Sequence, residues 1–375
     1  MRIAIINITG GGISGGYQVY LKNVLPRLAV HPGVEAVLCA APQLINVPSW
    51  FPSFSKVTFI DCKPFRFMRH RPNRELEQEV QRFAPDVIFI PVERYLNFKN
   101  IPLVVMVQNM GPLAPVAGNP ISERMRYVAQ RLEARLAVKR ATQVIAPTDF
   151  VRDFLVQRWN TPRAKVRTIH YGSIPHLDEH IVRTPAGILD AWKGQFLFTA
   201  GSIEPYRGLE DILGAMHRLK GNSELKGLVI AGEARTNMIK YRKKLERWVY
   251  HHGLRERIVW LGKLTQDQMS WCYDNCRAFV MTSRVESFGI IGLDAMAHGC
   301  VCVVADNPPL PEIFGDAAVY YPPTDGKALA ESIQSILHFN TTKQTEISEQ
   351  ARRRATTFSW DRTTERTLAV FAEAM

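Results

Sequence analysis

Cysteine and long hydrophobic runs are both scarce in this sequence. Its 375 residues contain six cysteines, namely Cys39, Cys62, Cys272, Cys276, Cys300 and Cys302. These are too few for a disulfide scaffold, and their spacings are not those of zinc sites, so we expect reduced and mostly buried thiols. No apolar stretch approaches the ~18–20 residues of a membrane span. The apolar run that begins the chain is too short for a signal sequence, so we expect a cytoplasmic protein.

Acidic residues are also in short supply. The chain has 47 Lys and Arg against 35 Asp and Glu, a formal net charge of +12. Residues 1–180 hold 23 basic and 13 acidic residues, and residues 181–375 hold 24 and 22, so the surplus is +10 in the first half and +2 in the second. The share of hydrophobic residues, 46%, is ordinary for a globular protein and excludes disordered and fibrous classes.

Short runs rich in Ile and Val alternate with longer amphipathic stretches, which is typical of βα units around a parallel sheet. We expect strands near 2–8, 34–41, 57–61, 86–91, 102–107, 143–146, 166–170, 195–200, 227–231, 257–261, 278–281 and 301–304. We expect helices near 15–29, 74–84, 122–140, 148–158, 207–220, 237–251, 265–275 and 288–299.

The length and this pattern predict an α/β protein with two doubly wound, Rossmann-like domains. The first domain covers 1–175, and a linker rich in Pro, Gly and polar residues covers 176–194. The second domain covers 195–357. A closing helix over 358–375, with Ser359 as its N-cap, could return to the N-terminal domain.

Ligands of such sheets bind at the carboxyl ends of the strands, so the loops after the strands are candidate sites. A glycine-rich loop, Thr9–Gly16, follows the first strand and leads into a helix, which suits a phosphate or a flexible turn. Gly201-Ser202 ends a later strand, and Arg207 follows at the start of a helix. Arg207 could bind a diphosphate there, or it could be a solvated arginine of the surface.

The most informative loop contains Glu286 and opens a helix near Phe288 that closes at Gly299. On a fully helical path, Asp294 would lie ~12 Å from Glu286, about the reach of a sugar–diphosphate–ribose unit. The alternative is that neither carboxylate binds a ligand. Glu286 would then be a charged residue of the loop, and Asp294 a charged residue on the surface of the helix. A fourth loop has three prolines and Glu312. Glu312 either binds a ligand or is an ordinary acidic residue in the first turn of a helix, where the helix dipole favours a negative charge.

These segments together resemble the retaining family 4 glycosyltransferases of GT-B fold. The resemblance covers nearly the whole chain and rests on Gly15-Gly16, Gly201 with Arg207-Gly208, Glu286–Gly289 with Asp294–Gly299, and Pro311-Glu312. It implies two domains that face each other across a cleft. It also implies a nucleotide-sugar donor held mainly by the C-terminal domain. Transfer would be of the hexosyl type, without metal or cofactor, to a saccharide or lipid-linked saccharide in surface polysaccharide or glycoconjugate biosynthesis.

The resemblance also assigns roles to single residues. Glu286 would bind hydroxyls of the donor sugar, Asp294 the ribose and Arg207 the diphosphate. The remaining donor-binding residues would be Gly15, Gly16, Gly201, Ser202, Phe288, Gly289 and Ile290. Retention would follow from front-face attack, with a phosphate oxygen of the leaving group as the base.

This chain differs from the usual family pattern at four places. The family has Glu at Asp294, Arg at Ser202, Lys at Arg207, and often a His after the strand at 102–107, where this chain has Gln108-Asn109. The two amides could still bind sugar hydroxyls or the charge that develops at the anomeric carbon. We therefore expect Glu286, Arg207 and Asn109 to be the catalytic residues, acting mainly through electrostatics.

The basic surplus of the first half is concentrated in two segments. Residues 63–74 contain five Lys or Arg and no acid, and the predicted helix at 122–140 adds more cations. Cations interleaved with Phe and Met suit an anionic bilayer, although a solubilising face would look similar. We predict a face for a lipid-linked acceptor, docked on the inner leaflet, that contains Arg66, Arg69, Arg71, Arg124 and Arg131.

Three alternatives remain at this point. The chain could be another GT-B nucleotide-sugar enzyme, such as an epimerase, or a catalytically inactive sugar-binding relative. A basic nucleic-acid binder is disfavoured, because no recognition motif accompanies the cations. We therefore expect no nucleic acid among its partners.

Overall fold

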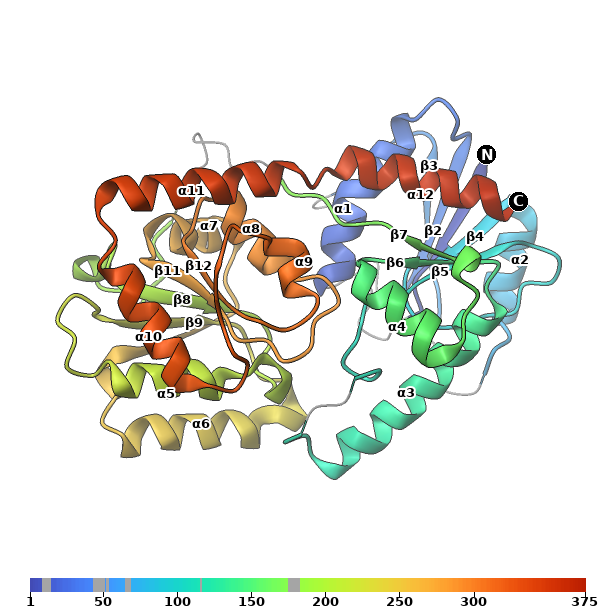
Figure 1. The fold of residues 1–375 in the computed structure, drawn as a ribbon. Helices are drawn as coiled ribbons and strands as arrows, with labels where there is room; N and C mark the ends of the chain where they lie inside the picture. The colour runs from blue at the N-terminus through green and yellow to red at the C-terminus, as the bar shows by residue number, and fades with distance from the viewer. Residues whose placement is uncertain (9–14, 43–50, 52–53, 65–68, 115–116, 175–182) are drawn as a thin grey trace. The chain divides into compact units, whose positions relative to one another are not determined.

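The computed structural model describes residues 1–8, 15–42, 51, 54–64, 69–114, 117–174 and 183–375 (Figure 1). The chain forms two compact units. Unit 1 comprises Met1–Pro115, Pro120–Gly172 and Ser359–Met375, and unit 2 comprises Val116–Asn119 and Ser173–Phe358. The C-terminal segment is therefore part of unit 1. Residues 176–182 of the linker expected at 176–194 lie outside the described residues, and 183–194 belong to unit 2.

Unit 1 is built on a parallel sheet with the strand order β3-β2-β1-β4-β5-β6-β7. Its described strands are β1 (Arg2–Ile6), β2 (Ala36–Ala41), β3 (Val57–Asp61), β4 (Val87–Ile90), β5 (Leu103–Met106), β6 (Gln143–Ala146) and β7 (Val166–Thr168). The central strands β4 and β5 are buried at every position. Helices cover both faces of such a sheet, which is why these strands are continuous apolar runs.

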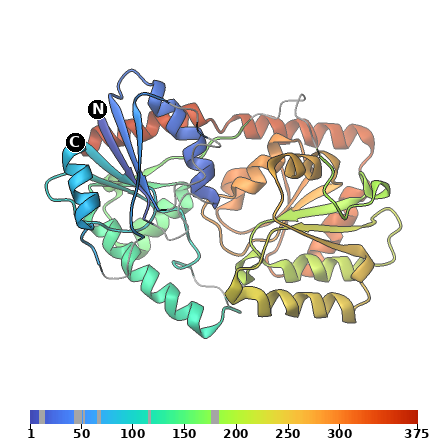
Figure 2. The same cartoon turned by 180° about the vertical axis from the view of Figure 1, so that it is seen from behind.

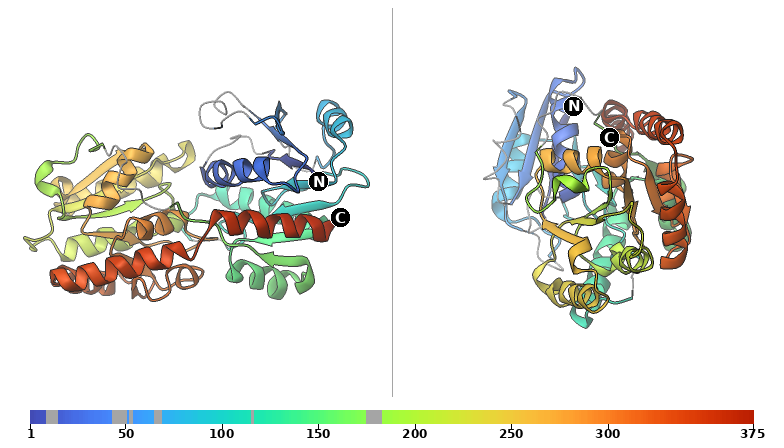
Figure 3. Two further views of the ribbon diagram at one scale, coloured as in Figure 1. Left: turned by 90° about the horizontal axis from the view of Figure 1, so that it is seen from above. Right: turned by 90° about the vertical axis from the view of Figure 1, so that its left-hand side faces the viewer.

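The described helices of unit 1 are α1 (Gly15–Val30), α2 (Arg74–Phe83), α3 (Ile121–Arg140), α4 (Asp149–Trp159) and α12 (Trp360–Ala374). Helices α1 and α12 lie side by side (Figure 3), and the rings of Tyr20, Tyr171 and Trp360 pack together between them. The Ser359 side chain accepts a hydrogen bond from the backbone N–H of Arg362, which confirms the predicted N-cap.

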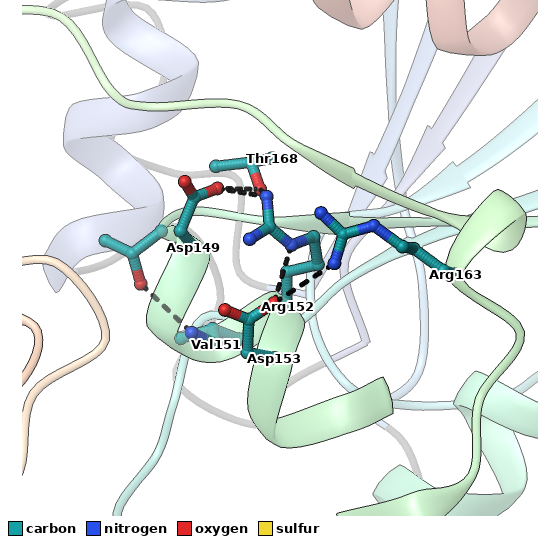
Figure 4. Close-up of polar contacts among 7 residues, drawn as sticks. Asp149, Val151, Arg152, Asp153, Arg163 and Thr168 are labelled. Atoms are coloured by element: carbon teal, nitrogen blue, oxygen red, sulfur yellow. Dashed lines mark hydrogen bonds and ion pairs between the residues drawn. The ribbon is translucent and has the colours of Figure 1, made fainter. Parts of the chain in front are cut away.

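A polar network ties α4 to β7 (Figure 4). The Thr148 hydroxyl caps α4 by accepting a hydrogen bond from the Val151 N–H. The Arg152 guanidinium contacts the carboxylates of Asp149 and Asp153 and, at 3.3 Å, the Thr168 hydroxyl of β7. The network fixes the start of α4 against the edge strand.

Unit 2 repeats the architecture with the strand order β10-β9-β8-β11-β12-β13. Its described strands are β8 (Phe196–Ala200), β9 (Gly227–Ala231), β10 (Ile258–Gly262), β11 (Ala278–Met281), β12 (Cys302–Ala305) and β13 (Val319–Tyr321), and all of their pairings are parallel. Phe198 and Phe279, from the neighbouring strands β8 and β11, contact each other in the buried core.

The described α-helices of unit 2 are α5 (Leu209–Arg218), α6 (Ile239–His251), α7 (Gln266–Asn275), α8 (Ile290–Ala297), α9 (Leu310–Phe314), α10 (Gly326–Leu337) and α11 (Thr341–Thr356). Helix α5 packs against α10, and α8 packs against α11. Helix α6 runs beside α5 (Figure 2), where the rings of Trp248 and His217 lie 6.1 Å apart.

Each strand and helix expected from the sequence is present, with its ends within two residues of the expected ones. The sequence analysis missed β13, α10 and α11. Strand β13 has only three residues, and α11 buries only Ala351 and Ala355, so neither produces a strong hydrophobic period. The expected state of the cysteines is confirmed: all six thiols are free, and five are buried.

Candidate active site

The strand order of unit 2 reverses between β8 and β11, which lie side by side at the centre of the sheet. The chain leaves these two strands toward opposite edges, so their carboxyl ends border a natural binding crevice. Gly201 and Ser202 follow β8, and Ser283 follows β11. Two of the segments singled out from the sequence therefore converge at this point.

Arg207 and Glu286 form an ion pair there. Ser283 joins them, because its hydroxyl donates to Glu286 Oε1 at 3.1 Å and lies 3.3 Å from Arg207 Nη1. The two charged side chains are only 17% and 12% exposed. Burial by itself lowers the pKa of Arg207, but Glu286, Tyr206 and Glu204 together more than offset this and the pKa is raised, so the guanidinium is a permanent cation.

The Arg207 guanidinium keeps one unused donor. Its Nε is buried and has no hydrogen-bond partner among the described residues. Gly201 lies opposite with φ +134°, and a Cβ at this position would lie 3.0 Å from Arg207 Nε. The absence of a Cβ lets the Arg207 guanidinium lie against the Gly201 backbone. A buried N–H donor without a partner fits an anionic oxygen of a ligand.

A turn holds Arg207 in place. The residues Pro205–Arg207 form a single 3-10 turn before α5, and Tyr206 lies beneath the guanidinium, 5.1 Å from Arg207 Cζ to the ring centre. The Tyr206 and Ser202 hydroxyls are 2.9 Å apart. The end of β11 fixes the turn from the other side, because Thr282 Oγ1 donates to the Arg207 carbonyl at 2.6 Å.

Helix α8 begins directly after this cluster. Gly289 is its N-cap with φ +100°, Ile290 is its first residue, and Phe288 is buried edge-to-face against Phe358. The helix N-terminus adds a positive dipole end near Glu286. As expected from the sequence, Glu286 precedes the helix, so the distance to Asp294 does not follow the helical rise of about 1.5 Å per residue over its whole length.

Asp294 lies one turn into α8, and among the described residues no hydrogen bond or ion pair joins it to Arg207 or Glu286. Burial raises the pKa of Asp294 to about 6, partly opposed by His298 one turn further along. The His298 ring in turn contacts Asp274 of α7 at 2.7 Å. The charge of the Asp294 carboxyl group therefore changes with pH in the mildly acidic range.

We expect Asp294→Asn to remove a pH-dependent part of the stability. The pKa of Asp294 lies above the unfolded value of ~3.9, so the folded protein binds more protons between pH 4 and pH 6. The free energy of unfolding of the wild type should fall relative to that of the variant by roughly 2–3 kcal/mol as the pH rises through this window. Urea denaturation at several pH values measures the difference. A difference that stays flat with pH contradicts the expectation.

The corresponding switch point of unit 1 lies where β1 meets β4. Gly15 and Gly16 begin α1, and the loop at 9–14 before them lies outside the described residues. Asn109 is exposed after β5, and its Oδ1 accepts a hydrogen bond from the Gly111 N–H at 2.9 Å.

The sequence analysis missed Glu93, a buried carboxyl that follows β4. Burial raises its pKa, opposed by Arg94 and by the backbone amides of Gln108 and Asn109, which hydrogen-bond to it. Glu93 thus anchors the loop that presents Asn109. The sequence could have singled out Glu93 as a candidate site residue because it follows a central strand. Ser283 follows a central strand of unit 2 in the same way.

A basic cavity of about 980 Å³ lies within unit 1. Its lining includes the cations Lys63, Arg69, Arg71 and Arg140, beside Tyr95 and Leu136. Two of the predicted acceptor-face residues, Arg69 and Arg71, are thus brought to one cavity. Arg124 and Arg131 lie on α3, and Arg66 lies outside the described residues.

Two family models match the chain. The model described as Glycosyltransferase Family 4 matches residues 14–173, and that described as Glycosyl transferases group 1 matches residues 190–354. The chain belongs to the family 4 glycosyltransferases. The second model contains the whole Arg207–Glu286 cluster, and the first contains Asn109 and the basic cavity, apart from Ile8 in its lining.

A curated relative of this glycosyltransferase is the O-antigen chain mannosyltransferase B of Escherichia coli. The two are 26% identical over 258 residues, which cover 66% of this chain and 65% of the relative. The chain thus spans just under two thirds of that relative's own length.

Solved structures show the same GT-B fold. The sucrose-phosphate synthase of Thermosynechococcus elongatus matches with a TM-score of 0.77 at 18% identity, over 100% of this chain and 98% of that chain. Anabaena HepE in complex with UDP-glucose matches with a TM-score of 0.74 at 17% identity, over 100% of both chains. The predicted family and fold are therefore confirmed.

Proposed function

We propose that this family 4 glycosyltransferase moves a hexose from a nucleotide-sugar donor to a growing surface polysaccharide, with retention of the anomeric configuration. The observation that carries the proposal is the Arg207–Glu286 cluster at the switch point of unit 2, in which the buried Arg207 Nε beside Gly201 has no hydrogen-bond partner among the described residues. HepE binds UDP-glucose, which supports a nucleotide sugar as the donor. The E. coli relative is named for the O-antigen chain, which supports a role in the synthesis of a surface polysaccharide.

In this proposal Arg207 binds the donor diphosphate, and Glu286 accepts hydrogen bonds from hydroxyls of the sugar. Asp294 binds the ribose, and Gly15, Gly16, Gly201, Ser202 and the amides of Phe288, Gly289 and Ile290 complete the donor site. The positive end of α8 adds to the field on the diphosphate.

The chemical step needs no protein nucleophile. The bond from the anomeric carbon to the diphosphate oxygen breaks, and the acceptor oxygen bonds to the same face of that carbon. The acceptor's proton passes to a phosphate oxygen of the leaving nucleoside diphosphate. Arg207 and the α8 N-terminus stabilise the charge of the leaving group, and the Asn109 carboxamide faces the charge at the anomeric carbon. Positive charge from the protein takes the place that a metal ion has in other transferases, so we propose metal-independent transfer.

We further propose that the acceptor is an anionic, lipid-linked saccharide bound in the basic cavity of unit 1. The four cations of its lining suit a diphosphate, while Tyr95 and Leu136 offer apolar surface to a sugar ring or a lipid stem. None of the described helices is long and apolar enough to cross a membrane. Contact with the bilayer in this proposal is therefore peripheral.

The proposal predicts that nucleotide sugars stabilise the protein against heat. A donor at about 100 times its dissociation constant should add ~2.7 kcal/mol to the free energy of unfolding. A thermal-shift screen of nucleoside diphosphates and nucleotide sugars identifies the donor, and labelled donor is then incubated with and without a lipid-linked acceptor. Label in the acceptor supports transfer. Conversion of the sugar without an acceptor indicates an epimerase, and absence of any stabilisation contradicts the donor site.

A further inference from the structure

Arg284 is held by three different segments of unit 2. It lies in the loop after β11, two residues before Glu286. Its backbone N–H donates to the Tyr206 carbonyl at 2.7 Å, and its carbonyl accepts a hydrogen bond from Asn307 Nδ2 at 2.7 Å. Its guanidinium contacts Asp211 Oδ1 of α5 at 3.1 Å. The loop that carries Glu286 is therefore fixed by both the main chain and the side chain of this one residue.

The backbone N–H of Arg284 joins the two segments that carry the charged side chains of the active site. Tyr206, whose carbonyl it contacts, precedes Arg207 in the 3-10 turn. The Thr282 hydroxyl makes a second hydrogen bond between the same two segments, to the Arg207 carbonyl. Gly208 permits this close approach, because a Cβ there would collide with the Thr282 carbonyl oxygen. The relative position of the two segments is thus set by direct contacts between their backbones.

Asp211 is a fixed partner for the Arg284 guanidinium. It lies in the first turn of α5, and its side chain is only 4% exposed. Its Oδ2 accepts hydrogen bonds from the Tyr321 hydroxyl at 3.2 Å and from the Thr324 N–H at 3.1 Å. Burial raises the pKa of Asp211, and the strongest opposing effect is the positive charge of Arg284. A buried carboxylate with both oxygens hydrogen-bonded holds the guanidinium in one orientation.

The Arg284 guanidinium acts at a distance from the ion pair of the active site. Within the described part of the chain, no hydrogen bond or ion pair joins it to Glu286, whose partners are Arg207 and Ser283. Any effect of the guanidinium on the carboxylate must therefore pass through the loop backbone. A shift of about 1 Å at the reacting groups can lower a rate roughly a hundredfold.

We propose that Arg284 is a positioning residue for sugar transfer, and that its pairing with Asp211 sets the place of the Glu286 carboxylate. Loss of the pair releases one of the contacts that fix the loop but leaves the 3-10 turn of Arg207 intact. The rate of transfer should then fall while the affinity for the diphosphate is kept. This inference rests on the proposed function for the transfer step, and on the contacts of the loop alone for its fixed position.

A double variant tests the proposal. Arg284→Met by itself would leave the buried Asp211 carboxylate without its cation and lower the stability. Asp211→Asn together with Arg284→Met removes both charges, so the fold should be kept. We expect kcat of this double variant to fall at least twentyfold. Its dissociation constant for UDP or GDP, whichever stabilises the wild type more, should change less than about threefold in calorimetry.

A conservative variant should rescue the rate. Arg284→Lys keeps the backbone contacts and a positive charge, and a single ammonium can replace the one guanidinium nitrogen that contacts Asp211. We expect its kcat to lie within about fivefold of the wild-type value. The matched control is Arg242→Met with Glu246→Gln, which removes an ion pair of α6 in the same unit. It should keep both the wild-type kcat and the wild-type nucleotide affinity.

Amide hydrogen exchange reports the position of the loop without any substrate. We expect peptides that cover 282–289 to exchange at least tenfold faster in the double variant than in the wild type, because the contacts of Arg284 protect this loop. Peptides that cover β9 should exchange at the wild-type rate, since the variant leaves the centre of the sheet unchanged.

Three results would overturn the proposal. The first is a folded double variant with the wild-type kcat. The second is a loss of nucleotide affinity as large as the loss of kcat, because the pair would then support the whole donor site rather than the loop. The third is an Arg284→Lys protein as slow as the double variant.

Hydrogen exchange separates this proposal from the proposed function. A wild type that transfers no sugar, together with faster exchange of 282–289 in the double variant, contradicts the proposed function alone. A wild type that transfers sugar, together with unchanged exchange of this loop, contradicts the role of Arg284 alone.

Discussion

Glu286→Gln is expected to lower the rate of sugar transfer at least a hundredfold, which corresponds to about 2.7 kcal/mol in the activation free energy. The carboxylate holds the Arg207 guanidinium and accepts the Ser283 hydroxyl, so both the sugar contact and the orientation of the cation depend on its charge. The Gln side chain keeps the size but not the charge. Initial rates with labelled donor, at varied donor and acceptor concentrations, separate kcat from KM.

The matched control for this variant is Glu224→Gln. Glu224 is an exposed acid of the same unit and should leave the rate unchanged when replaced. Circular dichroism and thermal unfolding of both variants show whether the fold is intact. A folded Glu286→Gln protein with a wild-type rate would contradict the assigned site.

Arg207→Met is expected to weaken nucleoside diphosphate binding at least a hundredfold. The guanidinium supplies the permanent cation at the carboxyl ends of β8 and β11, and its Nε is the buried donor left for a ligand oxygen. The same change leaves the Glu286 carboxylate buried without its cation, so the free energy of unfolding should fall by about 3–5 kcal/mol. Isothermal titration calorimetry measures the affinity, and urea denaturation measures the stability.

The double variant Arg207→Met, Glu286→Gln separates the two effects. Removing both charges should restore much of the stability lost in Arg207→Met but none of the ligand affinity. Arg242→Met is the control, because Arg242 pairs with Glu246 along α6 and takes no part in the cluster. Wild-type affinity in a folded Arg207→Met protein would exclude Arg207 from the diphosphate site.

The architecture could be predicted from the sequence because a buried parallel strand consists of a short run of apolar residues between two helical segments. Strands such as β4 and β11 are buried at every position, and their Ile, Val and Phe content marks them without further context. The prediction failed where burial is slight. Helix α11 presents a largely polar surface, and β13 is too short for any period to emerge.

The candidate site was predictable in part. Arg207 and Glu286 each follow a strand, and the rule that ligands bind at the carboxyl ends of strands singled out both segments. That the two side chains form one buried pair depends on β8 lying next to β11, which are separated in the chain by β9 and β10. The contacts of Tyr206 and Ser283 with the ion pair have no signature of their own in the sequence.

The sequence by itself determined the two-domain α/β design, the family motifs and the concentration of positive charge in the first half. It gave α3 as a helix with six cations and two acids, which is compatible with a solubilising surface or with a membrane face. Only the tertiary structure decided which side chains meet solvent. Packing on the unit 1 sheet buries Glu123 and Glu133 and leaves Met125, Val128 and Leu132 exposed, because a helix can turn only one face toward the core.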